Sequence, residues 1–256
     1  MPDRLRIMAA ALAALPLFAA PSPAQVLRDL PPLELEYVLT HGKPAVVVGS
    51  ASASFKPIDT PRGRRLEVRS LVEYTLPRTP PYTYEEEVTL VCDAKGVARF
   101  ETIARALGDE RVNTGVRMGQ DYQVTTTFRG KRTQTTITAG VQRTNFGLFS
   151  AVYLEDQLDS NEMFQDFPML FPVAGTHMAR QLFREGILPF AIDKEREIPV
   201  TVCRIEALDK TSDRIYNATT GPRILLRMEE VSNLGEIVYQ LARVNGVPAA
   251  ESELLR

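Results

Sequence analysis

Residues 64–137 read RRLEVRSLVEYTLPRTPPYTYEEEVTLVCDAKGVARFETIARALGDERVNTGVRMGQDYQVTTTFRGKRTQTTI, and their pattern indicates the fold class. Apolar and polar residues alternate through its successive segments, which are separated by turns that contain Pro or Gly. Because neighbouring side chains of a strand point to opposite faces, this alternation is typical of antiparallel strands with one buried face. We therefore expect a β-meander. The alternation groups Leu66, Val68, Val72 and Tyr74, then Tyr84, Glu86, Val88, Leu90 and Cys92, then Phe100, and in residues 111–118 it places Val112, Val116 and Met118 on one face.

Further strands are expected on both sides of this meander. Residues 33–40 alternate between apolar and polar side chains, and the small residues around Gly49 indicate a strand that another element crosses closely. Residues 198–208, 223–230 and 236–243 also have the composition of strands. The chain is therefore expected to be mainly β.

The alternation is lost between residues 138 and 190. Thr176 can cap the start of a helix and Gly186 can end it, so a short helix is expected there. Residues 160–172, SNEMFQDFPMLFP, are expected to form an apolar loop that something must cover. The segment 146–190 would then either close over the meander as a lid or fill its inner face as core.

The N-terminus has the features of a secretory signal peptide. Arg4 and Arg6 precede an apolar run, and Ser22 and Ala24 are small residues suited to cleavage before Gln25. We expect residues 1–24 to be removed and residues 25–256 to form a single β-rich domain in the periplasm. No later stretch approaches the roughly 20 apolar residues of a membrane-spanning helix, so no transmembrane segment is expected after cleavage.

The charge balance argues against a nucleic-acid partner. Residues 25–256 carry 28 basic and 31 acidic side chains, so the expected mature chain is almost neutral. Nucleic-acid binding needs a concentrated basic surface, and the densest basic group surrounds Gly63 in a turn.

Two cysteines, Cys92 and Cys203, lie in segments expected to be strands. An oxidising compartment would allow a disulfide between them, which would stabilise the fold by roughly 4 to 5 kcal/mol in the chain-entropy model. The alternative is two separate buried thiols that pack as small apolar side chains. The sequence leaves both open.

Catalysis and metal binding have little support in the sequence. The chain has two histidines, His41 and His177, and neither has the short spacing to other ligands that is typical of a zinc site. No phosphate-binding Gly-rich loop and no nucleophile motif is present. We expect no metal, no cofactor and no enzymatic activity.

Glu85, Glu86 and Glu87 form the densest group of carboxylates. Charged side chains often protect an edge strand from pairing with other chains, which is the simpler interpretation. If Glu86 instead points inward beside Tyr84, it is a pocket residue with a raised pKa, and a hydrolase using these two side chains would be the enzymatic alternative.

Three segments carry a resemblance to a known architecture: LEYVLTHGKPAVVVGSASASF (35–55), YTYEEEVTLVCDAKGVARFETIAR (82–105) and RILLRMEEVSNLGEIVYQLARV (223–244). In their strand order and turns they resemble the LolA/LolB-like periplasmic lipoprotein carriers and related uncharacterised secreted families. The resemblance implies an antiparallel meander curved into a half-barrel, with one or two short helices covering the concave face.

The leading hypothesis is a periplasmic protein that binds an apolar or amphipathic ligand, such as a lipid or acyl chain, on this concave face. The same apolar residues could instead form a filled core. A rival hypothesis is a structural or assembly factor that contacts a cell-envelope protein through an edge strand or through residues 160–172. The candidate ligand-binding residues are Val68, Val72, Tyr74, Tyr84, Val88, Phe100, Phe167 and Phe171.

Overall fold

The computed structural model describes residues 31–61, 63–93, 96–119, 121–137, 143–144, 164–171, 176–207, 211–219 and 224–256. All strands in these residues belong to one 16-stranded sheet. They are β1 (Leu33–His41), β2 (Val46–Thr60), β3 (Gly63–Leu76), β4 (Tyr82–Asp93), β5 (Gly96–Ala106), β6 (Asp109–Met118), β7 (Asp121–Phe128), β8 (Lys131–Ile137), β9 (Arg143–Thr144), β10 (Phe164–Phe171), β11 (Thr176–Ala191), β12 (Glu197–Glu206), β13 (Ser212–Ala218), β14 (Leu225–Ser232), β15 (Gly235–Val244) and β16 (Val247–Pro248). Two 3₁₀ turns, η2 (Ala249–Glu251) and η3 (Glu253–Leu255), complete the chain.

The sheet consists of two meanders joined at one seam. Its order is β8-β7-β6-β5-β4-β3-β2-β1-β15-β14-β13-β12-β11-β10-β9, with β16 on β15. Neighbouring strands are antiparallel except for the short β9–β10 pair, which is parallel. Antiparallel pairing of β1 with β15 joins the first meander to the last. The mainly β, antiparallel fold expected from the sequence is therefore confirmed.

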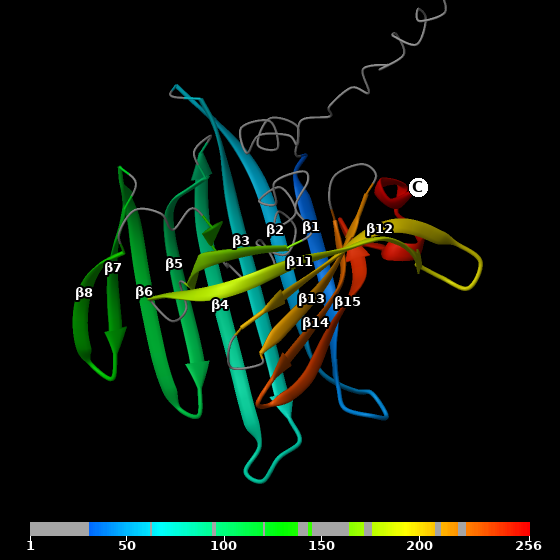
Figure 1. Ribbon diagram of the computed structural model, residues 1–256, viewed down its shortest axis with the longest axis horizontal. Coiled ribbons are helices and arrows are strands. Elements are labelled where there is room, and N and C mark those ends of the chain that lie inside the picture. Colours follow the sequence, from blue (N-terminus) through cyan, green and yellow to red (C-terminus); the bar gives the residue numbers. More distant parts are fainter. Residues whose placement is uncertain are drawn as a thin grey trace, which may run out of the picture.

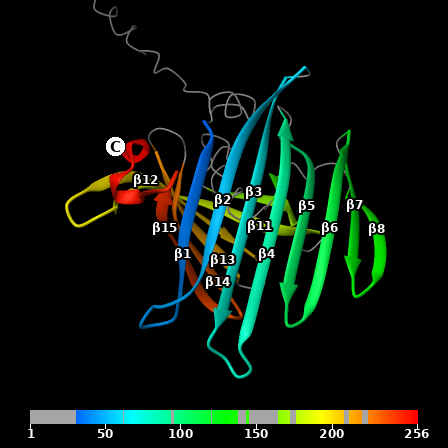
Figure 2. The same cartoon turned by 180° about the vertical axis from the view of Figure 1, so that it is seen from behind.

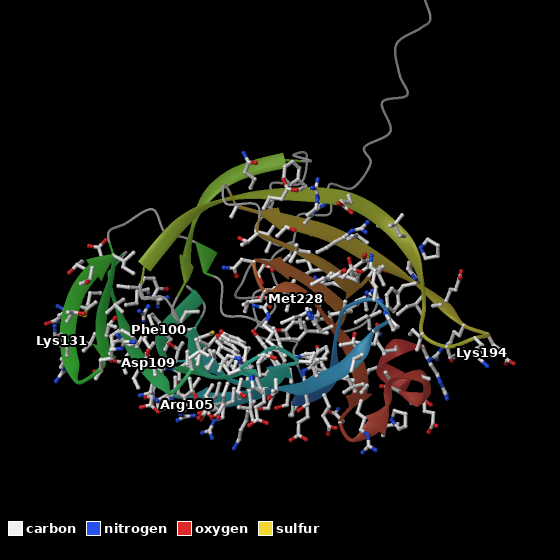
Figure 3. The ribbon with its side chains drawn as sticks, turned by 90° about the horizontal axis from the view of Figure 1, so that it is seen from below. Phe100, Arg105, Asp109, Lys131, Lys194 and Met228 are labelled. Atoms are coloured by element: carbon white, nitrogen blue, oxygen red, sulfur yellow. The ribbon has the colours of Figure 1, made fainter. Side chains whose placement is uncertain are left out.

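The sheet is strongly curved. β1 to β8 stand side by side as one wall (Figures 1 and 2). Seen from below, β11 arches over the concave side of that wall, with β12 to β14 beneath it (Figure 3). Within the described part of the chain no pairing joins β8 to β9, so the half-barrel remains open along that side.

The core lies between the two sides of this curved sheet. On β1 the pattern is strict, with Leu33, Leu35, Tyr37 and Leu39 buried and the residues between them exposed. Met228 and Phe100 point into the space between the layers (Figure 3). Burial of one face of each strand is the main apolar contribution to the stability of the fold.

The glycine expectation is confirmed on β2. A Cβ on Gly49 would lie 2.0 Å from the carbonyl oxygen of Glu73 and 2.7 Å from the Cα of Tyr74. β3 therefore approaches β2 so closely that only glycine fits at this position.

Strand β6 presents its apolar residues to solvent. Val112, Val116 and Met118 share a face, as the alternation predicts, but Val116 and Met118 are 51% and 60% exposed because this is the convex face. The pairing with β5 determines which face of β6 is buried, because Gly115 lies opposite the buried Phe100. Asn113, which is fully buried, is the other residue of β6 that the sequence pattern did not select.

The helix expected from Thr176 to Gly186 is wrong. These residues belong to strand β11, which pairs with β10 and β12. Gly186 has a φ of 117° and sits where the register with β12 shifts, so it marks a β-bulge and not the end of a helix. A glycine adopts a positive φ readily, so Gly186 suits a β-bulge as well as the end of a helix.

The apolar loop expected over residues 160–172 is also wrong for its described part. Residues Phe164–Phe171 form β10, which pairs with β11 on one side and with β9 on the other. The segment 146–190 is thus continuous with the sheet over its described strands and is not a separate helical cover. The expected signal peptide, residues 1–24, lies outside the described residues.

None of the helices in the described residues is both long enough and apolar enough to span a membrane.

The register of β5 and β6 can be tested at Gly115. A Cβ at this position would lie 2.1 Å from the Phe100 ring, so Gly115→Val should lower the free energy of unfolding by about 1 to 3 kcal/mol through overpacking. Thr114→Val, on the exposed face of the same strand, should change it by less than about 0.5 kcal/mol. Urea denaturation measures both, and equal effects of the two substitutions would contradict the register.

Candidate functional site

A row of directly opposed residues crosses the concave face near one end of the sheet. Tyr239 of β15 is opposite Leu39 of β1, and Leu39 is opposite Gly49 of β2. Gly49 is opposite Tyr74 of β3, which is opposite Tyr84 of β4. These pairings place side chains from both meanders on one face, along the end of the sheet that holds the β3–β4 and β14–β15 connections (bottom of Figure 1).

Glu86 points into the interior beside this row. It is two residues from Tyr84 and therefore on the same face of β4, opposite Val72 of β3 and Ala104 of β5. The edge-strand interpretation of Glu85, Glu86 and Glu87 is wrong, because β4 lies between β3 and β5.

The other two carboxylates of the triplet point outward. Glu85 and Glu87 both pair with the guanidinium of Arg105, and the distance from Arg105 Nη1 to Glu87 Oε1 is 2.7 Å. These groups are partly exposed, so the ion pairs contribute little to stability. One run of three glutamates therefore supplies a surface ion-pair group and a single interior carboxyl.

Two carboxyl–phenol pairs stand on the concave face. The Tyr84 hydroxyl donates to Oε2 of Glu86 at 2.5 Å, and the Tyr239 hydroxyl donates to Oε2 of Glu230 at 3.1 Å. Glu230 lies on β14 and Tyr239 on β15, so one pair comes from each meander. The charge of Glu230 acts on Glu86, and the charges of both glutamates act on Tyr84 and Tyr239, so the pairs form a single group.

Tyr74 completes this group. Its side chain is 6% exposed, and its ring stacks on that of Tyr84 with 5.2 Å between the centroids. Glu230, Tyr82 and Glu86 all act electrostatically on its hydroxyl, which makes no hydrogen bond to any described residue. We call Tyr74, Tyr82, Tyr84, Glu86, Glu230 and Tyr239 the acid–tyrosine cluster.

Burial alters the acid strength of these groups. Desolvation is the main cause that raises the pKa of Glu86, and the charge of Glu230 raises it further against the lowering effect of the Tyr84 hydrogen bond. Desolvation likewise raises the pKa of Glu230, while the hydrogen bond from Tyr239 lowers it. Both carboxyls thus bind a proton more readily than an exposed glutamate does.

The cluster is deep but not sealed. Glu86 and Glu230 are surrounded by protein, and yet each keeps part of its surface accessible, as do the inward-facing Tyr84 and Ala104. Further along the same face, Val88 is 2% exposed and Leu90 is completely buried. The concave face therefore has a filled end and an accessible end, and the carboxyls lie at the accessible end.

The candidate ligand-binding residues divide between these two ends. Val68, Val88 and Phe100 are at most 3% exposed and belong to the filled end, where they pack as core. Val72 and Tyr74 are 6% exposed and border the accessible end, which Tyr84 lines. Phe167 and Phe171 lie on β10, where the structure describes the backbone pairing alone.

Glu230 and Tyr239 were not among the residues selected from the sequence. Residues 223–230 and 236–243 were expected to be strands, but nothing in the sequence places them beside residues 74–86. The sequence did contain one signal for an inward position. Glu230 and Tyr239 alternate with buried apolar residues of their strands, as Glu86 and Tyr84 do on β4.

Cys92 and Cys203 are both buried and form no disulfide with each other. Of the two alternatives left open by the sequence, the structure has the separate buried thiols. Burial raises the pKa of Cys92 to about 12, so this thiol is unreactive at neutral pH.

No family model matches this chain, and no curated protein matches it. A crystal structure of a β-barrel-like protein of domain of unknown function DUF1849 from Brucella abortus is similar, with a TM-score of 0.60 and 12% sequence identity over 84% of this chain and 98% of that chain. At this identity the likeness shows the β-barrel-like fold alone, and it does not single out the lipoprotein carriers.

The raised carboxyl pKa values predict a pH dependence of stability. A raised pKa means that the folded protein holds the proton more tightly than the unfolded chain, so this stabilisation is present below the ordinary glutamate value of 4.5 and is lost as the pH rises through the raised values. Replacing both Glu86 and Glu230 by Gln should remove this loss of stability at higher pH. The amide oxygen of each glutamine can still accept the hydrogen bond from Tyr84 or Tyr239.

Urea denaturation between pH 4 and pH 8 measures the effect. From pH 4 to pH 8, the difference in free energy of unfolding between the double variant and the wild type should shift by about 1 kcal/mol or more in favour of the variant. The control is Glu85→Gln with Glu87→Gln, which removes two charges from the outer face of β4 and should leave the pH profile of the wild type unchanged. Parallel profiles for the wild type and the Glu86/Glu230 variant would contradict the assignment.

Proposed function

We propose that this chain is an exported periplasmic protein that binds an apolar or amphipathic small molecule, such as a lipid or an acyl chain, on the concave face of its curved sheet. The observation that supports this most is the accessible end of that face. Side chains there are deep in the protein and still partly exposed, whereas a filled core would leave them without accessible surface.

The composition of the face supports an amphipathic ligand in particular. Ligand sites are mostly apolar with a few well-placed polar groups, and here the apolar residues Val72 and Val88 adjoin the carboxyl of Glu86. Ala104 and Ala106, on β5 opposite Glu86 and Tyr84, have small side chains that leave room over these positions. An apolar chain would lie on the valines and its polar head would meet the cluster.

The resemblance of the sequence to the LolA/LolB-like carriers fits the same role. The fold is similar to that of a β-barrel-like protein. A half-barrel of this kind can present one continuous apolar surface to a ligand. The N-terminal segment with the features of a signal peptide is the basis for the periplasmic location.

No catalytic activity is proposed. Glu86 and Tyr84 are within hydrogen-bonding distance, as the hydrolase alternative required. Hydrolysis of an ester or amide also needs groups that stabilise a developing oxyanion, and the two carboxylates of the cluster would oppose that negative charge.

A blocking substitution tests the proposed site. Ala104→Phe would place a ring over the accessible end beside Glu86, and it should weaken binding of the neutral apolar dye N-phenyl-1-naphthylamine at least about tenfold, which is about 1.4 kcal/mol. Fluorescence titration measures the affinity, and native mass spectrometry of the purified protein shows whether a lipid co-purifies.

The matched control is Ser52→Phe, which adds the same ring to the exposed face of β2. It should bind the dye like the wild type. No dye binding and no co-purifying lipid in the wild type would refute the proposed function, and equal affinities of the Ala104→Phe variant and the wild type would refute the location.

A further inference from the structure

We propose that the acid–tyrosine cluster binds the cationic head of an amphipathic amine, a primary or quaternary ammonium group joined to an apolar chain. This inference rests on the proposed function, because it assigns the chemical class of the ligand to the same concave face. Three features at the accessible end support it: the carboxyls of Glu86 and Glu230, the Tyr74 hydroxyl without a hydrogen bond to a described residue, and the tyrosine rings.

Negative charges dominate the described surroundings of the cluster. Among the described residues, the ionisable groups that act on Glu86, Glu230, Tyr74 and Tyr239 are carboxyls and phenols, and none of them is a lysine or an arginine. Arg78 acts on Tyr82 alone within the cluster, and its guanidinium donates to the carbonyl oxygen of Leu234 at 2.6 Å. A buried carboxylate needs a counter-charge, and the described residues do not supply one inside the cluster.

Tyr74 provides the independent sign of a ligand. Its side chain is nine-tenths buried, and its hydroxyl lies within electrostatic range of both glutamates without a hydrogen bond to any described residue. The hydroxyl oxygen keeps a small accessible surface, so a ligand at the accessible end can reach it. An ammonium group held between Glu86 and Glu230 would donate to this phenol oxygen and to the carboxylates together.

The tyrosine rings suit the same head group. Tyr74 stacks on Tyr84, and its centroid is 6.4 Å from that of Tyr82, so three ring faces gather on β3 and β4. A cation over an aromatic face is attracted by the ring quadrupole, and more strongly when it is desolvated. Quaternary ammonium groups, which cannot donate hydrogen bonds, would be held through these rings and the carboxylates.

An anionic head is disfavoured by the same geometry. The carboxylate of a fatty acid would approach two glutamates with no positive side chain to receive it, and burying like charges together is costly. The cluster should therefore select amphipathic amines over fatty acids of the same chain length.

The experiment compares probes that differ in the head group alone. Dodecyltrimethylammonium, dodecylamine, dodecanol and dodecanoate, each below its micelle concentration, are titrated at pH 7.5 against the full chain loaded with N-phenyl-1-naphthylamine. We expect the two ammonium probes to bind at least tenfold more tightly than dodecanoate. Replacing both Glu86 and Glu230 by Gln should remove this preference, and Tyr74→Phe should weaken ammonium binding several-fold without loss of folding.

The matched control removes two glutamates from the opposite face of β4. Glu85→Gln with Glu87→Gln makes the same change in net charge, and it should keep the preference for ammonium because these groups pair with Arg105 on the outer surface. Loss of the preference in this control would attribute it to net charge and overturn the inference.

The pH dependence gives a second readout. The charge of dodecyltrimethylammonium is fixed, so any change of its affinity with pH reports on the protein. Among the described residues, the titratable groups that interact with Glu86 or Glu230 are these two carboxyls themselves and Tyr74, Tyr82, Tyr84 and Tyr239. Because burial raises the pKa of both carboxyls, the affinity should rise with pH as they lose their protons. A flat profile would overturn the inference.

The outcomes separate this inference from the proposed function. If dodecanol and dodecanoate bind as tightly as the ammonium probes, the concave face binds apolar chains but the cluster does not select a cation. If neither the dye nor any probe binds, the proposed function fails and the inference fails with it.

Discussion

The pairing of β1 with β15 is the contact on which the rest of the sheet depends. It joins residues separated by about 200 positions in the sequence, and the backbone ladder from Leu35↔Val244 to His41↔Ile237 is reinforced at both ends. The amide of Glu34 donates to Oδ1 of Asn245 at 2.7 Å, and Nδ1 of His41 is 2.9 Å from the carbonyl oxygen of Glu236. Without this seam the chain would be two meanders, each with an unpaired edge and half of a concave face.

The seam also creates the chemistry of the concave face. Each meander carries one glutamate and at least one tyrosine at inward positions, and the row from Tyr239 through Leu39 and Gly49 to Tyr74 brings these residues together. The absence of a side chain at Gly49 lets β3 approach β2 closely at this position, next to the tyrosine that has no hydrogen-bond partner among the described residues. A one-residue slip at the seam would turn Tyr239 and Glu230 to the outer face, because the side chains of a strand alternate.

Local alternation was enough to predict the first meander, and it was not enough for the strands that follow. Residues 64–137 alternate, so their strands could be predicted, but the edge-strand interpretation of Glu86 was preferred to the inward position that the structure shows. β11 could not be predicted, because a glycine such as Gly186 suits the end of a helix as well as a β-bulge. The face of β6 depends on how Gly115 meets Phe100 across strands, and the partnership of Glu86 with Glu230 depends on the seam, so neither is a property of any short window of sequence.

The position of the two carboxyls explains how the sheet tolerates them. At the filled end, beside Leu90 and Phe100, a carboxylate would be completely desolvated and would cost more than its hydrogen bond returns. At the accessible end each carboxyl keeps some contact with solvent, accepts one phenol hydrogen bond and can take up a proton at modest cost. When the carboxyls ionise, the described residues of the cluster supply no cationic side chain to balance them, so solvent contact and proton uptake are what make their position tolerable.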